Sequence, residues 1–253
     1  MKTVQIRDLV IGEGIPKVLV PIVGKTAEEI LEKGREIANM AFDIVEWRVD
    51  FYEDALDRAA LSDTLARLRE TLGEKPLLFT FRTAREGGMQ EIDPVTYVEL
   101  NIAAAESGCA DLVDVEIFTG DSLARRCVEG VHRAGKAVIG SNHEFERTPT
   151  KADIIYRLRK MQDMDADILK IAVMPRSKAD VLTLLCATEE MARCYADRPL
   201  VTMSMSPIGV ISRICGEAFG SAMTFGAVGQ TSAPGQIPVE ALNTSLRILH
   251  AAG

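Results

Sequence analysis

An ionisable side chain interrupts a segment that otherwise has the character of a buried strand. Lys170 stands between Leu169 and Ile171 in the run DILKIAV (167–173), and apolar residues follow it. A charge is costly in a strand that is covered on both faces, unless the charge is paired or has a function. Desolvation or a neighbouring cation such as an arginine lowers the pKa of a lysine and yields the neutral amine that attacks a ketone. Lys170 is therefore the first candidate for covalent catalysis through a Schiff base.

Further titratable residues lie near the ends of predicted strands. Glu46 and Arg48 share one strand face by the two-residue period, Arg82 closes the next strand, and His143 directly follows another. They lie in the C-terminal half of their strands or just beyond it, where barrel enzymes place their chemistry. Because His143 comes one strand before Lys170, it is the candidate general acid and base.

A structural interpretation of some of these charges stays open. Glu46 and Arg48 could form an ion pair across layers of a barrel interior, and Asp114 and Glu116 could have a similar role on the fourth strand. The other two histidines, His132 and His250, lie on predicted helices and are expected at the surface.

Three polar loops that follow strands could complete a site. In AREGGMQ (84–90), the Glu86 carboxylate could orient a nearby imidazole. Arg213 lies near a predicted helix in SPIGVISRICGEAFGS (206–221), where it could bind a carboxylate through two prongs. The segment GAVGQTSAPGQIP (226–238), which contains Ser232 and Gln236, has the composition of a mobile loop that closes on a ligand, and equally that of an ordinary surface loop.

The elements that must position these residues alternate between β-branched runs and longer helical periods. This alternation predicts βα units and a parallel sheet. Eight strands are predicted at 17–23, 43–49, 76–82, 111–117, 136–142, 167–173, 199–205 and 222–228, and helices at 27–40, 55–72, 94–107, 121–134, 152–164, 178–195, 209–218 and 238–250. Gly108, Gly135 and Asp165 stand where helices should end.

We therefore expect an α/β fold, a (β/α)8 TIM barrel that forms a single domain over residues 1–253. A short β-hairpin at 4–11 is expected to cap the bottom of the barrel. A doubly wound open sheet is the alternative architecture.

Composition narrows the class of protein. The chain has 253 residues, 47% of them apolar, and its 37 acidic and 29 basic side chains give a formal charge of -8. This charge disfavours nucleic acid and anionic membranes as partners, but an anionic small molecule can still bind where arginines gather in a cleft. Five separated cysteines and an N-terminus without an apolar signal segment predict reduced core cysteines in a cytoplasmic protein.

Several cofactor motifs are missing from the sequence. It contains no GxGxxG after a strand, no GxxxxGK[ST], no HExxH and no Cys/His cluster with metal spacing. We therefore expect neither a cofactor nor a metal, and chemistry that comes from side chains alone.

Segments along nearly the whole chain resemble the type I 3-dehydroquinate dehydratases, barrel lyases of the shikimate pathway. They are EWRVD (46–50), FTFR with EGG (79–88), SNHEF (141–145), DILKIAVMP (167–175), TMSMS with GVISR (202–213), FG (225–226) and SAPGQ (232–236). No single segment would suffice, but together they are specific. The resemblance implies a homodimeric hydro-lyase that converts 3-dehydroquinate to 3-dehydroshikimate, either in chorismate and aromatic amino acid biosynthesis or in a catabolic use of the same reaction.

The family pattern also implies a role for each matching residue. Lys170 would form an imine with the substrate ketone, His143 would transfer the proton, and Glu86 would hold and polarise His143. The implied substrate-binding residues are Glu46, Arg48 and Arg82 for the ring hydroxyls, Arg213, Ser232 and Gln236 for the carboxylate and nearby oxygens, and Met203, Met205 and Phe225 for the apolar wall. Pro21 departs from the pattern, because some members have a serine at this place.

The implied chemistry is physically consistent. A protonated imine is an electron sink that acidifies the neighbouring carbon, so a neutral histidine can remove its proton, and the resulting enamine expels the β-hydroxyl by syn elimination. Two alternatives remain at this stage. One is a class I aldolase on a TIM barrel, which would need a phosphate cradle after the last two strands, and the other is a catalytically inactive sensor of a quinate-like acid.

Overall fold

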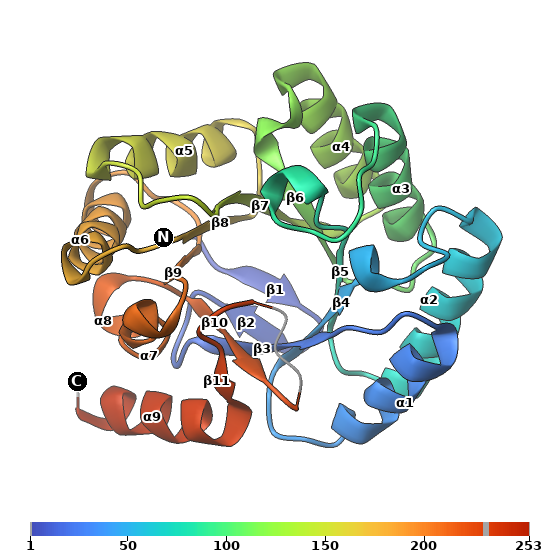
Figure 1. The fold of residues 1–253 in the computed structure, drawn as a ribbon, viewed down its shortest axis with the longest axis horizontal. Coiled ribbons are helices and arrows are strands. Elements are labelled where there is room, and N and C mark those ends of the chain that lie inside the picture. The colour runs from blue at the N-terminus through green and yellow to red at the C-terminus, as the bar shows by residue number, and fades with distance from the viewer. Residues whose placement is uncertain (1, 230–232, 253) are drawn as a thin grey trace.

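A ring of parallel strands surrounded by helices makes up most of the molecule (Figure 1), and the computed structural model describes residues 2–229 and 233–252. The ring strands are β3 (Lys17–Ile22), β4 (Ile44–Arg48), β5 (Leu77–Thr80), β6 (Leu112–Glu116), β7 (Ala137–Glu144), β8 (Ile168–Val173), β9 (Leu200–Ser204) and β10 (Met223–Ala227). The helices are α1 (Ala27–Ile37), α2 (Arg58–Leu72), α3 (Pro94–Glu106), α4 (Asp121–Arg133), α5 (Lys151–Asp163), α6 (Lys178–Cys194), α7 (Ile211–Ile214), α8 (Gly216–Phe219) and α9 (Val239–Ala252).

The strand order is consecutive around the ring. It runs β10-β3-β4-β5-β6-β7-β8-β9. The short β11 (Ile237–Pro238) pairs with the edge of β10 that does not pair with β3. The seam between β9 and β10 closes through a bridge of Leu200 with Ser221 and a hydrogen bond of 2.7 Å from the Ala222 amide to the Leu200 carbonyl. A doubly wound sheet would reverse its strand order and leave two open edges, so that alternative is wrong and the predicted TIM barrel is confirmed.

The barrel interior changes from apolar to charged along the strand direction. Inward positions follow the two-residue period, and in TIM barrels alternate strands fill one layer. Aliphatic side chains near the strand starts belong to one interior cluster, among them Leu19, Ile44, Leu78, Leu112, Ile139 and Ile168. One period further along β4, β6 and β8 stand Glu46, Asp114 and Lys170, all buried. Charge therefore gathers at the carboxyl end, above an apolar floor.

The N-terminal hairpin covers that floor, as predicted. Strands β1 (Val4–Ile6) and β2 (Leu9–Ile11) pair antiparallel, and Ile6 and Ile11 are buried in the same cluster as Leu19 and Ile44. A second and larger cluster fills the space between the strands and the surrounding helices. The hairpin therefore keeps water from the end of the barrel opposite the charged layers.

Most helix boundaries follow from local chemistry. Asp57 and Asp93 cap α2 and α3, since each carboxylate accepts two amide hydrogens of the first turn. The predicted helix ends are confirmed at Gly108, Gly135 and Asp165, which adopt positive φ values of 76, 71 and 66°.

Two predictions about elements need correction. The helix expected at 209–218 is broken into a 3-10 turn, α7 and α8, because Cys215 leaves helical geometry at φ -88 and ψ 9. Gly209 begins this region against β9, and a Cβ there would lie 2.3 Å from the Ser204 carbonyl oxygen. Strand β7 is longer than predicted and ends at Glu144, so that His143 lies within the strand rather than after it.

The surface differs from the expectation for the cysteines. Cys127 is buried, but Cys186 and Cys194 are exposed on α6, so the prediction of a core position is wrong for these two.

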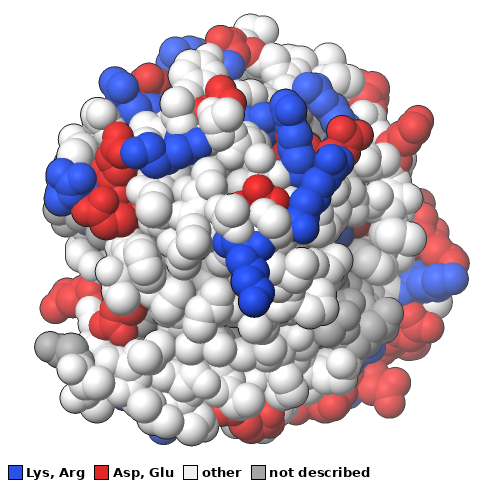
Figure 2. Space-filling model, turned by 60° about the vertical axis from the view of Figure 1, so that its left-hand side comes forward, with Lys and Arg blue, Asp and Glu red and all other residues white. Residues whose placement is uncertain are grey.

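On the face drawn in Figure 2, basic side chains are interleaved with acidic ones, and a broad area carries neither. Within residues 2–229 and 233–252, the helices lack the length and apolar character that a membrane crossing requires.

Candidate active site

A cavity of about 830 Å³, counted with its open mouth, lies at the carboxyl end of the barrel. It gathers all the predicted site residues that the structure describes. These are Lys170, His143, Glu86, Glu46, Arg48, Arg82, Arg213, Gln236, Met203, Met205 and Phe225. The remaining predicted residue, Ser232, lies outside the described residues. Residues from segments that are far apart in the chain therefore line one cavity.

Lys170 projects from β8 into the floor of this cavity and is only 3% exposed. Its Nζ lies 2.9 Å from Asp114 Oδ2 and 3.7 Å from Glu46 Oε1, and it also lies 4.7 Å from the centre of the Phe225 ring. The direct partners of this amine are therefore two carboxylates and an aromatic face. The nitrogen thus lies in a place that stabilises positive charge.

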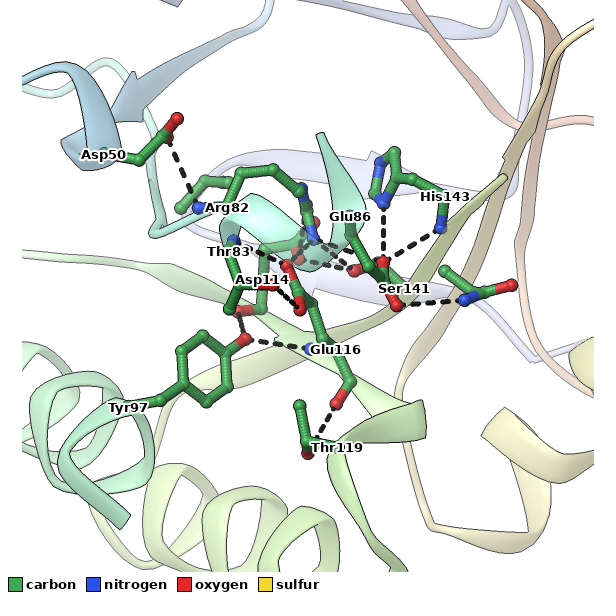
Figure 3. A network of polar contacts seen from close by, with 12 residues as sticks. Asp50, Arg82, Thr83, Glu86, Tyr97, Asp114, Glu116, Thr119, Ser141 and His143 are labelled. Carbon is green, nitrogen blue, oxygen red and sulfur yellow. Dashed lines mark hydrogen bonds and ion pairs between the residues drawn. The ribbon is translucent and has the colours of Figure 1, made fainter. Parts of the chain in front are cut away.

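A buried network behind Lys170 is organised by Arg82 (Figure 3). The guanidinium of Arg82 contacts Asp114 Oδ1 at 2.7 Å and Glu116 Oε1 at 2.8 Å, and it donates to Ser141 Oγ at 3.1 Å. Glu116 also accepts from the amide and the hydroxyl of Thr83. The charges of this region are therefore paired and hydrogen-bonded, which is the condition under which burial of ionic groups is tolerated. Arg82 lines the cavity, but its contacts here are with protein carboxylates.

His143 and Glu86 form the pair that the sequence predicts (Figure 3). The His143 Nδ1 lies 3.1 Å from Glu86 Oε2, which also accepts from the His143 amide at 2.9 Å, and Glu86 Oε1 accepts from Asn142 Nδ2 at 2.9 Å. The 3-10 turn Ala84–Glu86 after β5 places this carboxylate beside β7.

Burial has opposite effects on the two partners of this pair. It raises the pKa of Glu86 to about 8, with help from the neighbouring Glu116 carboxylate. It lowers the pKa of His143 well below its usual value, and the cations Arg82 and Lys170 add to this effect. A histidine held neutral in this way can accept a proton from a bound molecule.

The ion pair considered for Glu46 and Arg48 is not formed. Arg48 instead contacts Asp50 through two prongs, Nε to Oδ1 and Nη2 to Oδ2, both at 2.8 Å. Glu46 accepts from Thr80 Oγ1 at 3.0 Å and faces Lys170. The two-residue period places both side chains on one face but does not choose their partners.

Arg213 is the exceptional charge of the cavity. It is 1% exposed, and its guanidinium contacts the Met203 sulfur at 3.7 Å and the Pro234 carbonyl oxygen at 3.1 Å. Among the described residues, its Nε has no hydrogen-bond partner and no carboxylate forms an ion pair with it. Burial lowers its pKa to about 10. A helix arginine is usually solvated, but this one lies buried on the short α7 and lines the cavity, where it can bind an anion.

Sequence analysis missed two acidic residues that touch the functional side chains. Asp114 was considered only as part of a structural ion pair, and Asp50 received no role, although it fixes Arg48 and accepts from the Met89 amide at 3.1 Å. A signal for Asp114 existed, because it shares an alternate-strand layer with Lys170. Phe51, Met89 and Phe145 also line the cavity without having been singled out. Among the described residues, no group of three or more His, Cys, Asp or Glu side chains could hold a metal ion.

The fold and the site define a (β/α)8 barrel with a buried lysine, a histidine–glutamate pair and, at its carboxyl end, an arginine without a carboxylate partner among the described residues. The family model of the type I 3-dehydroquinases matches residues 18–252. The chain is 53% identical over 252 residues to the 3-dehydroquinate dehydratase of Salmonella typhimurium, with 100% of both chains covered. This protein belongs to the type I 3-dehydroquinase family.

Solved structures agree with this assignment. A type I 3-dehydroquinate dehydratase from Clostridium difficile, with covalently modified comenic acid, superposes with a TM-score of 0.96 at 47% identity and covers 100% of this chain and 99% of its own. The 3-dehydroquinate dehydratase from Geobacillus kaustophilus superposes with a TM-score of 0.95 at 38% identity and covers 99% of this chain and 97% of its own.

Proposed function

We propose that this protein is a hydro-lyase that dehydrates 3-dehydroquinate to 3-dehydroshikimate by syn elimination through a Schiff base on Lys170. Membership of the family and the names of its relatives support the reaction. The observation that carries the mechanism is the position of Lys170, a buried amine that points into a cavity together with His143 and Arg213.

The first chemical step joins Lys170 to the substrate ketone. The nitrogen of the ammonium gives up two protons and bonds to the carbonyl carbon. The carbonyl oxygen takes both protons and leaves as water, so that an iminium with one positive charge remains. We assign the substrate carboxylate and its nearby oxygens to Arg213, Ser232 and Gln236, because a buried guanidinium without a carboxylate partner among the described residues matches this group. Arg48, Arg82 and Glu46 are assigned to the ring hydroxyls, and Met203, Met205 and Phe225 to the apolar wall.

The second step uses one acid-base residue twice. His143 removes a proton from the carbon next to the iminium, and the electron pair forms an enamine. The enamine expels the β-hydroxyl, which takes the same proton from His143 on the same face and leaves as water. Hydrolysis of the new iminium then frees Lys170. Glu86 orients the ring through Nδ1, so that the other nitrogen remains available for the substrate.

The two alternatives fit less well. A class I aldolase that binds a phosphate would need a cradle of backbone amides after the last strands, whereas this site offers a guanidinium suited to a carboxylate. An inactive sensor would not need a buried lysine beside a carboxylate or a histidine that contacts a glutamate, and this site has both.

Borohydride reduction in the presence of 3-dehydroquinate tests the proposal. Mass spectrometry should find the reduced adduct on the peptide that contains Lys170. Lys170→Ala should abolish the adduct and turnover, while Lys178→Ala, which alters an exposed lysine on α6, should change neither. His143→Ala should still form the adduct, while turnover falls by about 10²–10⁴-fold. Near-normal turnover in His143→Ala would remove its acid-base role, and an adduct on another lysine would refute the mechanism.

Three expectations of the sequence accompany this proposal. We propose that the chain is a single domain, that it forms a homodimer, and that it acts in the cytoplasm on a small anionic substrate without a cofactor. Analytical ultracentrifugation tests the dimer, and a single cooperative unfolding transition tests the domain.

A further inference from the structure

One layer of the barrel core surrounds the nitrogen of Lys170. Its members come from alternate strands, Glu46 from β4, Asp114 from β6, Lys170 from β8 and Phe225 from β10. From Nζ, the Asp114 carboxylate lies at 2.9 Å, the Glu46 carboxylate at 3.7 Å and the Phe225 ring centre at 4.7 Å. Two anions and an aromatic face thus surround a single nitrogen.

The two oxygens of Asp114 have separate partners. Oδ1 accepts from Arg82 at 2.7 Å and from Ser141 at 2.6 Å, whereas Oδ2 faces Lys170 at 2.9 Å. Oδ1 therefore anchors the side chain in the network behind the cavity, and Oδ2 is presented to the amine. Glu116 also pairs with Arg82, so Asp114 is not the sole carboxylate that neutralises this arginine. A carboxylate with that role alone would not need to direct its second oxygen at Lys170.

Asp114 also stays charged while it faces the amine. It is fully buried, and burial alone would raise its pKa, but Arg82 and then Lys170 outweigh this effect and hold the pKa well below its usual range. Asp114 therefore does not take up the proton that Lys170 must lose before it attacks.

We propose that Asp114 is a catalytic residue that serves as the counter-ion of the substrate iminium on Lys170. The inference rests on the proposed function and deepens it. The ammonium and the iminium carry one positive charge on the same nitrogen, so a fixed anion stabilises both. Without this anion the iminium would lose its proton to give a neutral imine, which withdraws electrons weakly and would not acidify the neighbouring carbon.

Asp114→Asn removes the charge but keeps the shape of the side chain, and it is the direct test. We expect kcat to fall by about 10²–10³-fold, the size of effect seen when one preorganised electrostatic contact is lost, while KM changes little. A structural role alone would not alter the protonation of the adduct. Cyanoborohydride reduces an iminium much faster than a neutral imine, so the pH dependence of trapping measures that protonation. Its midpoint should fall by about one pH unit or more in Asp114→Asn.

Two further variants keep the test decisive. Glu116→Gln removes a buried charge from the same strand and the same network without a contact to Nζ, and it should shift the midpoint less than Asp114→Asn does. Ser141→Ala removes one hydrogen bond to Oδ1 and should shift the midpoint in the same direction by a smaller amount, and it decides the question if Asp114→Asn does not fold.

The outcomes separate this inference from the proposed function. If the wild-type protein forms no adduct on Lys170, the proposed function fails. If the wild-type protein forms the adduct and the midpoint stays unchanged in folded Asp114→Asn, or in Ser141→Ala when the former does not fold, only the counter-ion role is overturned. A shift in Glu116→Gln as large as that in Asp114→Asn would likewise overturn it.

Discussion

Two buried arginines at opposite sides of one cavity have opposite surroundings. Arg82 is 3% exposed and meets Asp114 and Glu116 at 2.7 and 2.8 Å, whereas Arg213 is 1% exposed and its partners are a carbonyl oxygen and a sulfur. A buried charge without a counter-charge is costly. The comparison indicates that protein carboxylates stabilise the charge of Arg82, whereas an anionic ligand would stabilise the charge of Arg213.

Removal of the paired arginine should have the largest effect on the folded state. Arg82→Met leaves Asp114 and Glu116 without their shared cation, and breaking a buried ion pair from one side costs about 3–5 kcal/mol. Urea denaturation of the ligand-free protein measures this loss. A variant as stable as the wild type would show that the network does not depend on Arg82.

Removal of the unpaired arginine should damage activity instead. In Arg213→Met, kcat/KM should fall by roughly 30-fold or more, since a buried charge contact with a ligand is worth about 2–5 kcal/mol. The free energy of unfolding without ligand should stay equal or rise, because the buried charge is gone. Arg213→Lys is the matched control that keeps the charge without the fork. If ligand-free Arg213→Met were destabilised as much as Arg82→Met, the proposed difference between the two arginines would be wrong.

Ligand-linked stability should sharpen the same contrast. Quinate carries the carboxylate but no ketone, so it can bind without reaction at Lys170. At about 100 times its dissociation constant it should stabilise the wild type by about 2.7 kcal/mol. Arg213→Met should lose this increase at the same quinate concentration. Equal stabilisation of both proteins would place the carboxylate elsewhere in the cavity.

The smallest expected effect concerns pH. Because the pKa of Glu86 rises from 4.5 to about 8 on folding, the folded state holds more protons between these values, and stability falls as pH rises through this window. His143 acts in the opposite direction below 6.5, because its folded pKa is lowered. Between pH 6.5 and 8 Glu86 should therefore contribute a decline of at most about 1.4 kcal/mol per pH unit. His132 adds a decline of the same sign above pH 6.5, because its hydrogen bond to Asp167 raises its pKa.

Urea midpoints across this range test the assignment. Glu86→Gln should flatten the decline, since an amide does not titrate. A variant that keeps the wild-type slope would show that another group causes it. The pH effect is linked to the network around Arg82, because the Glu116 carboxylate, which pairs with Arg82, contributes to the raised pKa of Glu86.

The sequence by itself determined the repeating units, the helix ends at Gly108, Gly135 and Asp165, and the set of residues that could reach one barrel mouth. These features depend on local backbone chemistry and on the two-residue period of strands, both of which can be recognised in short segments. The sequence could predict that residues 46, 48, 82, 143 and 170 lie close together, because the carboxyl ends of all strands in a parallel barrel lie at the same end of the barrel.

Only the tertiary structure decided which charges meet. Arg48 binds Asp50 rather than Glu46, Lys170 faces Asp114 across the barrel, and Arg213 turns inward where a predicted helix breaks. These contacts depend on the stagger between strands that are distant in sequence and on a change of direction at Cys215. Neither is encoded in a local period, because partner choice among buried charges is set by distances across the whole barrel.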